Sequence, residues 1–133
     1  MQTTARRKVG AVLIGLAAAL LVTACAEPRP ANTTTKFDGQ YAGAYTFSGG
    51  ERACVQAPVP PTMKIVDGRM SLQYSPREWD VYFEQYVTDS GAIDNQVTTH
   101  NGVIHLRGNI VGDTFTGTTV NPNCRYDIVM KKK

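Results

Sequence analysis

Alternation between apolar and polar residues runs through the chain after residue 37, and this alternation limits the fold more than any other feature. The apolar members of the clearest runs are Met63 and Ile65; Met70, Leu72 and Tyr74; Ile104, Leu106 and Ile110; and Tyr126, Ile128 and Met130. A period of two puts every second side chain on the same face of a β-strand, so each run predicts a strand with one buried face. We expect strands at 40–48, 62–66, 69–74, 79–88, 92–98, 103–109, 114–120 and 124–130.

Four short segments between these strands have the composition of tight turns. They are Val66-Asp67-Gly68-Arg69, Asp89-Ser90-Gly91, His100-Asn101-Gly102 and Val111-Gly112-Asp113. Gly, Asn and Asp tolerate the positive φ angles of hairpin turns, and successive hairpins place each strand beside the next one. The sequence therefore predicts an all-β meander. A small eight-stranded up-and-down barrel is favoured because closure removes exposed sheet edges, and an open sandwich is the alternative. The strand glycines Gly43, Gly108 and Gly117 suit the tight bends of a small barrel.

The segment around Trp79 is compatible with two structures. Ser75-Pro76-Arg77-Glu78 fits a helix capping box, and a helix would place Trp79, Phe83 and Tyr86 on one face. The same segment is rich in aromatic and β-branched residues and alternates in period two, so we favour a strand. Trp79 would then face the core. The opposite face would carry Glu78, Asp80, Tyr82, Glu84 and Tyr86. That face is either simply solvated, the reading we favour, or a surface for a basic partner.

Residues 1–24 have the organisation of a secretory signal peptide. Arg6, Arg7 and Lys8 precede an uncharged, largely apolar run from 9 to 22, and small residues follow it. A helix of 14 residues would span about 21 Å, whereas the hydrocarbon core of a bilayer is about 30 Å thick. The run is therefore too short for a transmembrane helix.

The four residues Val22-Thr23-Ala24-Cys25 at the end of this run resemble a lipobox, the recognition site of bacterial lipoprotein signal peptidase. The resemblance implies cleavage before Cys25 and a diacylglyceryl group on its sulfur, and two acyl chains suffice for stable anchoring in a membrane. Ala26 stands where an Asp would retain an enterobacterial lipoprotein in the inner membrane. The expected location is therefore the outer membrane, facing the periplasm.

We expect three parts in the chain: a signal peptide at 1–24, the lipidated Cys25 with a polar linker to residue 36, and one barrel domain at 37–133. The linker contains Pro28 and Pro30 and no apolar periodicity. The three basic residues named above are the only charged residues before Cys25, so residues 25–133 carry no net formal charge. A neutral domain gives no reason to expect nucleic acid as a partner.

Cys54 and Cys124 are the two cysteines that remain after lipidation, and an even pair in an exported domain predicts a disulfide. In a closed eight-strand meander, the first and last strands are antiparallel neighbours. Cys54 follows the first strand and Cys124 begins the last, so both lie at one end of the same seam. At the other end, Lys131, Lys132 and Lys133 would lie beside the tether, where they could contact a membrane surface or form a solvated tail.

No motif in the chain indicates catalysis. The sequence contains no G-x-S-x-G, C-x-x-C or H-E-x-x-H pattern and no phosphate-binding glycine loop, so we expect neither an enzyme nor a cofactor. His100 and His105 are the only histidines. With Asn101-Gly102 as the turn, His105 would pair with Thr98, and the two histidines would share a solvent-facing surface without a third ligand. We expect no metal site there.

The spacing of several motifs resembles small, uncharacterised β-barrel lipoproteins of the Gram-negative envelope. The residues that carry this resemblance are Phe37-Asp38-Gly39 with Tyr41, then Phe115-Thr116-Gly117, and Cys124-Arg125-Tyr126. The resemblance carries no assigned activity. From the lipobox and the missing catalytic motifs, we expect a membrane-anchored, non-enzymatic interaction or structural module whose envelope partner is not specified. Two alternatives stay open. One is a barrel that binds a small apolar ligand, for which a cavity of roughly 300 Å³ is needed. The other is an inhibitor of a periplasmic lysozyme or protease, acting through the proline-rich loop at 57–61.

Overall fold

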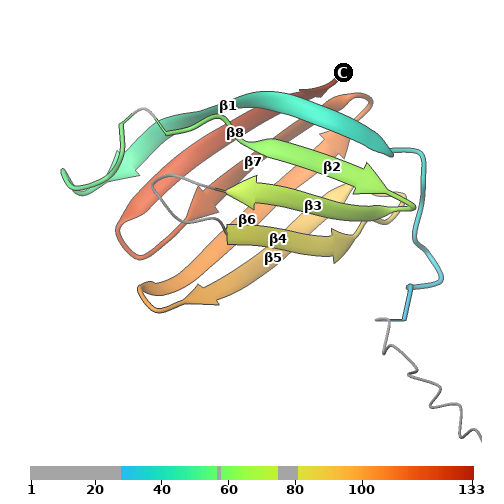
Figure 1. The fold of residues 1–133 in the computed structure, drawn as a ribbon, viewed down its shortest axis with the longest axis horizontal. Helices are drawn as coiled ribbons and strands as arrows, with labels where there is room; N and C mark the ends of the chain where they lie inside the picture. Colours follow the sequence, from blue (N-terminus) through green and yellow to red (C-terminus); the bar gives the residue numbers. More distant parts are fainter. Residues whose placement is uncertain (1–27, 57, 75–80) are drawn as a thin grey trace, which may run out of the picture.

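Eight antiparallel strands form a single sheet in the computed structural model, which describes residues 28–56, 58–74 and 81–133. The strands are β1 (Gly39–Gly50), β2 (Thr62–Val66), β3 (Arg69–Tyr74), β4 (Val81–Tyr86), β5 (Ala92–Thr99), β6 (Gly102–Val111), β7 (Thr114–Val120) and β8 (Cys124–Lys132). Their order in the sheet is β4-β3-β2-β1-β8-β7-β6-β5, so all strands that are consecutive in sequence pair except β4 and β5, and β1 also pairs with β8 (Figure 1). The described residues include no helix long and apolar enough to cross a membrane.

The sheet curls into a nearly closed barrel, in which β4 and β5 come together as its two edges. The described residues form no backbone ladder between these strands. Two side-chain amides cross the gap instead. Asn95 Nδ2 donates to the carbonyl of Glu84 at 2.7 Å, and Gln85 Nε2 donates to the carbonyl of Ala92 at 3.4 Å. The predicted all-β meander and its barrel form are therefore confirmed, with side chains closing the last seam.

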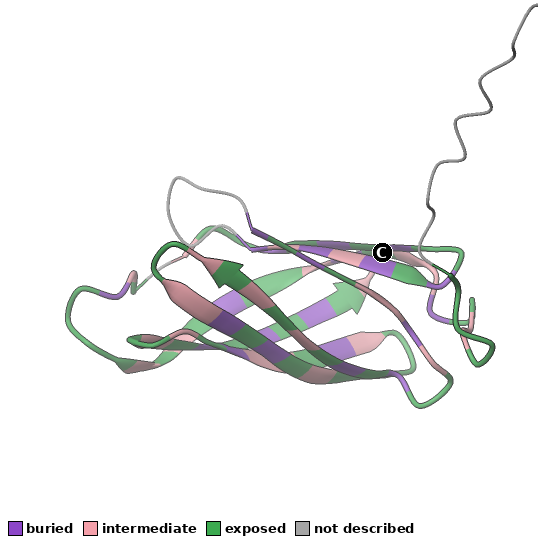
Figure 2. Cartoon of the chain, turned by 90° about the horizontal axis from the view of Figure 1, so that it is seen from below, coloured by how far each residue is buried: buried purple, intermediate pink, exposed green. Residues whose placement is uncertain are grey.

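The alternating residues fill the interior as the sequence predicts. Buried and exposed residues alternate along the strands (Figure 2). The core consists of Phe37, Tyr41, Tyr45, Met63, Ile65, Met70, Leu72, Tyr74, Val81, Phe83, Val87, Ile93, Ile104, Leu106, Ile110, Phe115, Tyr126, Ile128 and Met130. An eight-stranded barrel is just wide enough for side chains to fill it.

Two glycine positions let backbone and ring atoms approach closely. A Cβ on Gly43 would lie 1.9 Å from the carbonyl oxygen of Val129, so only glycine allows β1 to approach β8 at this point. Gly108 and Gly117 face each other across β6 and β7, and the Phe115 ring packs against the positions their Cβ atoms would take. These glycines allow the tightly curved sheet to form because a side chain at any of the three positions would collide with backbone or ring atoms.

The main differences from prediction lie at strand ends. The predicted strand at 79–88 is observed only as Val81–Tyr86. Trp79, like the proposed capping box at 75–78, lies outside the described residues. Val87 leaves the strand: its N–H donates to the carbonyl of Gly68 and its carbonyl accepts from the N–H of Thr34. β8 continues through Lys132, so two of the three terminal lysines belong to a strand and not to a tail.

The turn between β5 and β6 is shifted by one residue from the prediction. Thr99 pairs with Gly102, which makes His100 and Asn101 the turn residues, and His105 pairs with Gln96 instead of Thr98. The Thr99 hydroxyl stabilises this register because it donates to the carbonyl of Gly102 and accepts from the N–H of Asn101. The predicted pairing of His105 with Thr98, from which we expected His100 and His105 to share a surface, is therefore wrong.

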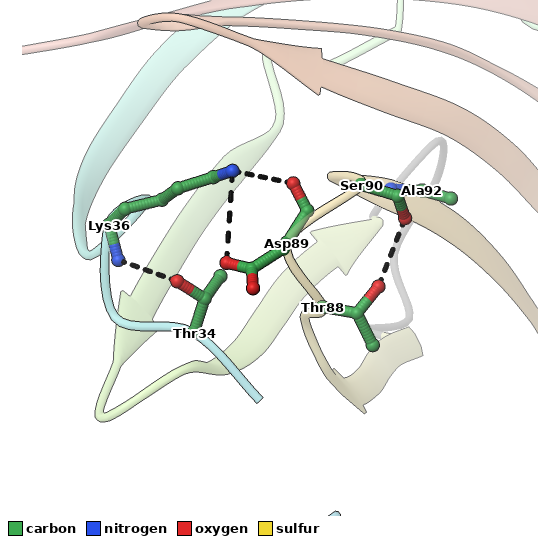
Figure 3. Close-up of polar contacts among 6 residues, drawn as sticks. All are labelled: Thr34, Lys36, Thr88, Asp89, Ser90 and Ala92. Atoms are coloured by element: carbon green, nitrogen blue, oxygen red, sulfur yellow. Dashed lines mark hydrogen bonds and ion pairs between the residues drawn. The ribbon is translucent and has the colours of Figure 1, made fainter. Parts of the chain in front are cut away.

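The end of the predicted linker is docked on the barrel. Thr33 forms an isolated bridge with Thr88, and the Thr33 N–H donates to the carbonyl of Pro30. Lys36 Nζ donates to the carbonyl of Asp89 and lies 3.8 Å from Asp89 Oδ1, next to the Thr88–Ser90 hydroxyl pair (Figure 3). The segment from residue 33 therefore belongs to the domain, and the linker is correspondingly shorter than expected.

The predicted disulfide is present between Cys54 and Cys124. Their Cα atoms are 5.7 Å apart, and the bond joins the loop after β1 to the first residue of β8. The two cysteines are 70 residues apart in sequence. A loop of this length gives a stabilisation of about 4 kcal/mol in the chain-entropy model of disulfides.

Candidate functional site

The barrel has two chemically different poles. We call the end where β1 begins and β8 finishes the tether pole, which also carries the turns at 67–68, 88–91 and 112–113. The other end, where β1 finishes, carries the loop 51–61 and the turns at 100–101 and 121–123, and we call it the pocket pole (Figure 1). β1 has 12 residues, and at about 3.4 Å per residue it runs roughly 40 Å from one pole to the other, tilted against the barrel axis.

A pocket of about 340 Å³ opens at the pocket pole. Its described lining comprises Glu51, Ala53, Cys54, Val55, Tyr74, Val81, Thr99, Asn101, Gly102, Ile104, Asn121, Pro122, Asn123, Cys124 and Tyr126. The apolar members and the disulfide form the walls, and three asparagines and a threonine add polar groups. This mixture of an apolar wall with a few placed polar groups is typical of small-molecule sites.

A tyrosine cluster closes the pocket on its inner side. The rings of Tyr45 and Tyr74 are in an edge-to-face contact with centroids 5.2 Å apart, and Tyr126 lies 6.2 Å and 6.4 Å from them. Phe47 and Phe83 extend the cluster along the barrel. Edge-to-face pairs are favourable contacts between aromatic rings, so the cluster is a firm floor.

Three hydroxyl groups at or next to this floor have no hydrogen-bond partner among the described residues, and of the three residues only Tyr74 lines the pocket. Tyr45 Oη, Tyr74 Oη and Thr119 Oγ1 are buried and have no hydrogen-bond partner at acceptable geometry among the described residues. Burial raises the pKa of Tyr74 to about 12, partly opposed by polar attraction to the side chains of Thr119 and Asn121, which lie near its hydroxyl without reaching hydrogen-bond geometry. Burial raises the pKa of Tyr45 even further. Both phenols are therefore protonated in neutral water, and each can donate a hydrogen bond.

The rim of the pocket is held in place by its own hydrogen bonds. Asn121 Oδ1 accepts from the N–H groups of Asn123 and Cys124, at 3.0 and 2.6 Å. The Asn123 carbonyl in turn accepts from the N–H of Glu51 at 3.0 Å, which ties the loop after β1 to the turn before β8. Together with the disulfide, these bonds fix the mouth of the pocket.

The acidic-aromatic face of β4 is only partly described. Tyr82 is 51% exposed and points outward, as predicted. Glu84 also faces outward, but it forms an ion pair with Arg69 at 3.1 Å, which reduces its availability to a basic partner. Glu78 and Asp80 lie outside the described residues, and a role of this face in partner binding stays a prediction.

The structure brings the terminal lysines to the start of β1. Lys132 pairs with Tyr41 and Lys131 with Ala42, and the Lys133 N–H donates to the carbonyl of Gln40 at 2.9 Å. The chain end and the docked segment at 33–38 therefore meet at the tether pole, as the eight-strand topology predicts.

Aspartates also lie at the tether pole and partly offset the positive charge of its lysines. Asp67, Asp89 and Asp113 occupy its three turns. Asp38 accepts hydrogen bonds from the N–H groups of Asp67 and Gly68 and so fixes the β2–β3 turn. This contact has no signature in the spacing of the sequence, because it joins residues about thirty positions apart.

The remaining predicted positions carry less chemistry. His105 is exposed on β6, and the described residues contain no group of three or more His, Cys, Asp or Glu side chains that could hold a metal ion. In the proline-rich loop, Ala57 lies outside the described residues and Val59 is 58% exposed. Comparison of the chain with protein families, curated proteins and solved structures finds no match. The resemblance to envelope lipoproteins therefore stays a prediction, and the functional argument rests on the pocket.

Proposed function

We propose that this chain is a non-enzymatic, lipid-anchored protein of the bacterial envelope that binds a small molecule at the pocket pole of its barrel. One observation carries the binding proposal: a pocket of about 340 Å³ is lined by Tyr74, whose buried hydroxyl has no hydrogen-bond partner among the described residues. An unsatisfied buried hydroxyl costs about 1–3 kcal/mol, so a bound molecule that pairs with it regains stability. The volume lies within the range of ligand pockets in proteins, about 300–1,000 Å³.

Anchoring is supported by the sequence Val22-Thr23-Ala24-Cys25 after an apolar run. Lipid on Cys25 would hold the tether pole next to the membrane and present the pocket pole to the periplasm. Changing Cys25 to Ala should leave an unprocessed precursor that incorporates no labelled palmitate in a Gram-negative host. Normal labelling of this variant would contradict the anchoring proposal without touching the binding proposal.

Binding can be tested by filling the pocket in the full chain. Val55 lines the pocket and is partly buried, so Val55→Trp should occupy its mouth. Val59 lies in the same loop, is 58% exposed and is not part of the lining, so Val59→Trp is a matched control.

The parent and both variants are purified from envelope membranes, denatured, and analysed for released small molecules by mass spectrometry. We expect one compound to be released from the parent and the control in near-equal amounts and to be depleted at least fivefold from Val55→Trp. Identical profiles for the three proteins would contradict the proposal.

A further inference from the structure

The charges around the pocket restrict its ligand, and the inference that follows rests on the proposed binding function. Glu51 is the one charged residue in the described lining, and it lies exposed at the rim. No lysine, arginine or histidine belongs to that described lining. Moving an anion from water into an apolar site without a counter-charge is strongly unfavourable. The described lining therefore disfavours carboxylates, phosphates and sulfonates.

The inner end of the pocket calls for a hydrogen-bonding group on the ligand. Tyr74 lines the pocket and is 1% exposed, and its hydroxyl has no partner among the described residues. Thr119, fully buried beside it, also carries an unpartnered hydroxyl. Of the two residues only Tyr74 lines the pocket, so a purely apolar ligand would leave the Tyr74 hydroxyl unsatisfied, whereas an oxygen on the ligand could accept from it.

The walls define the body of the ligand. Val81, Ile104 and Pro122 supply aliphatic surface, and the ring of Tyr126 supplies aromatic surface. The volume of about 340 Å³ is at the small end for ligand pockets, so it suits a single fused-ring system or a short chain.

We propose that the pocket binds an uncharged, compact apolar molecule through one hydroxyl or carbonyl oxygen, which pairs with the Tyr74 hydroxyl at the inner end. Tyr74 is thus the residue that selects a ligand with a polar head over a hydrocarbon of the same shape. Glu51 and the absence of a cation from the described lining select against an anionic head.

Three probes with the same body and different heads separate these effects: 1-naphthol, 1-methylnaphthalene and 1-naphthoate. Titration calorimetry uses a chain that begins at Ala26. This chain retains the barrel's strand pairing, core and disulfide, all of which lie within residues 33–133. We expect 1-naphthol to bind about tenfold more tightly than 1-methylnaphthalene, the value of one buried hydrogen bond of about 1.4 kcal/mol. 1-Naphthoate should bind at least tenfold more weakly than 1-naphthol.

Tyr74→Phe tests the hydrogen bond directly. This variant should lose about tenfold in affinity for 1-naphthol and stay within twofold of the parent for 1-methylnaphthalene. Tyr82→Phe is the matched control, because Tyr82 lies on the outer face and is 51% exposed, and it should change neither affinity. If Tyr74→Phe lowers the melting temperature, the ratio of its affinities for 1-naphthol and 1-methylnaphthalene decides the test, because a loss of stability weakens both probes equally; this ratio should fall from about ten to about one.

The outcomes distinguish the inference from the function on which it rests. Equal affinities of 1-naphthol and 1-methylnaphthalene, or preference for 1-naphthoate, would overturn the inferred ligand class while small-molecule binding stands. Failure of all three probes to bind would overturn both.

Discussion

Two buried tyrosines of the barrel, Tyr41 and Tyr45, differ in whether the hydroxyl group has a hydrogen-bond partner. The Tyr41 hydroxyl donates to the carbonyl of Phe37 at 2.8 Å, whereas the Tyr45 hydroxyl has no partner among the described residues. The first hydroxyl contributes to the fold. The second costs stability unless something outside the barrel pairs with it.

Substitution by phenylalanine should therefore act in opposite directions at these two positions. Tyr41→Phe should lower the free energy of unfolding by about 1–2 kcal/mol, because it leaves the buried Phe37 carbonyl unpaired. Tyr45→Phe should leave it unchanged or raise it by up to about 1 kcal/mol. Urea unfolding followed by circular dichroism measures both. A loss at Tyr45 as large as that at Tyr41 would show that the Tyr45 hydroxyl is satisfied in the fold.

The buried phenols also predict how stability depends on pH. Because burial raises the pKa of Tyr74 to about 12, the native state keeps this proton after the unfolded chain, with a pKa near 10, has lost it. The stabilising effect is fully present below pH 10 and disappears as the pH rises from 10 to 12, at up to about 1.4 kcal/mol per pH unit for each group. Tyr74→Phe should decline less steeply than the parent over this interval. Parallel curves for the two proteins would contradict the assignment.

Among the strands, β1 links the two halves of the sheet and leads into the disulfide. It pairs with β2 near the tether pole and with β8 along most of its length, and its last residues lead to Cys54. The close approach of β1 to β8 depends on Gly43, where a Cβ would meet the Val129 carbonyl oxygen.

Two glycines of β1 offer a matched test of this close approach. Gly43→Ala should lower the free energy of unfolding by about 1–3 kcal/mol, the usual range for overpacking. Gly49→Ala should be neutral or slightly stabilising, because no atom lies within 4 Å of its Cβ position. Thermal unfolding of the two variants compares them. Equal melting temperatures would mean that the two strands can separate without cost.

Strands were predictable from the sequence wherever one face is buried, because apolar and polar residues then alternate, as around Met63 and Ile65 or Ile128 and Met130. The β5–β6 register was missed because it depends on the Thr99 hydroxyl, a single local contact that outweighs the Asn-Gly signal. Docking of Thr33 and Thr34 was missed because backbone groups make it, and backbone bonds leave no side-chain pattern. The disulfide was predictable because the topology alone brings its two ends together.

The pocket could not be predicted, because no segment of the chain carries it. Its described lining comes from the loop after β1, the turns before β6 and β8, and residues near the ends of β3, β4, β5, β6 and β8. These parts are far apart in sequence, and each one alone reads as an ordinary turn or strand end. Only Tyr74 hints at it: a large polar-tipped side chain at an inward position needs a partner when it is buried.

At the scale of the whole molecule, we propose that one end of the barrel faces the membrane and the other end binds the ligand. The tether pole carries Lys131, Lys132 and Lys133 beside the start of β1, and the pocket lies at the other pole. Near an anionic membrane each lysine contributes about 1 kcal/mol of attraction, which fades within a Debye length of about 8 Å at physiological salt.

Vesicle binding tests this orientation. A chain beginning at Ala26 should bind anionic vesicles weakly at low salt, and replacing the three terminal lysines with Gln should abolish that binding without lowering the melting temperature. Aspartates at 67, 89 and 113 oppose the attraction, so the effect is expected to be small and salt-sensitive. Equal binding of the Gln variant and the parent would mean that these lysines do not face the membrane.

The central claim is that the pocket pole, and no other surface, binds a small molecule. The most direct measurement is an amide NMR titration of the isotopically labelled chain from Ala26 with 1-naphthol. The claim predicts saturable shifts that concentrate at Thr99, Asn101, Gly102 and 121–124, with the turn at 112–113 and the terminal lysines unmoved. Shifts scattered over the outer faces or centred on the tether pole, or no saturable shifts at all, would contradict it.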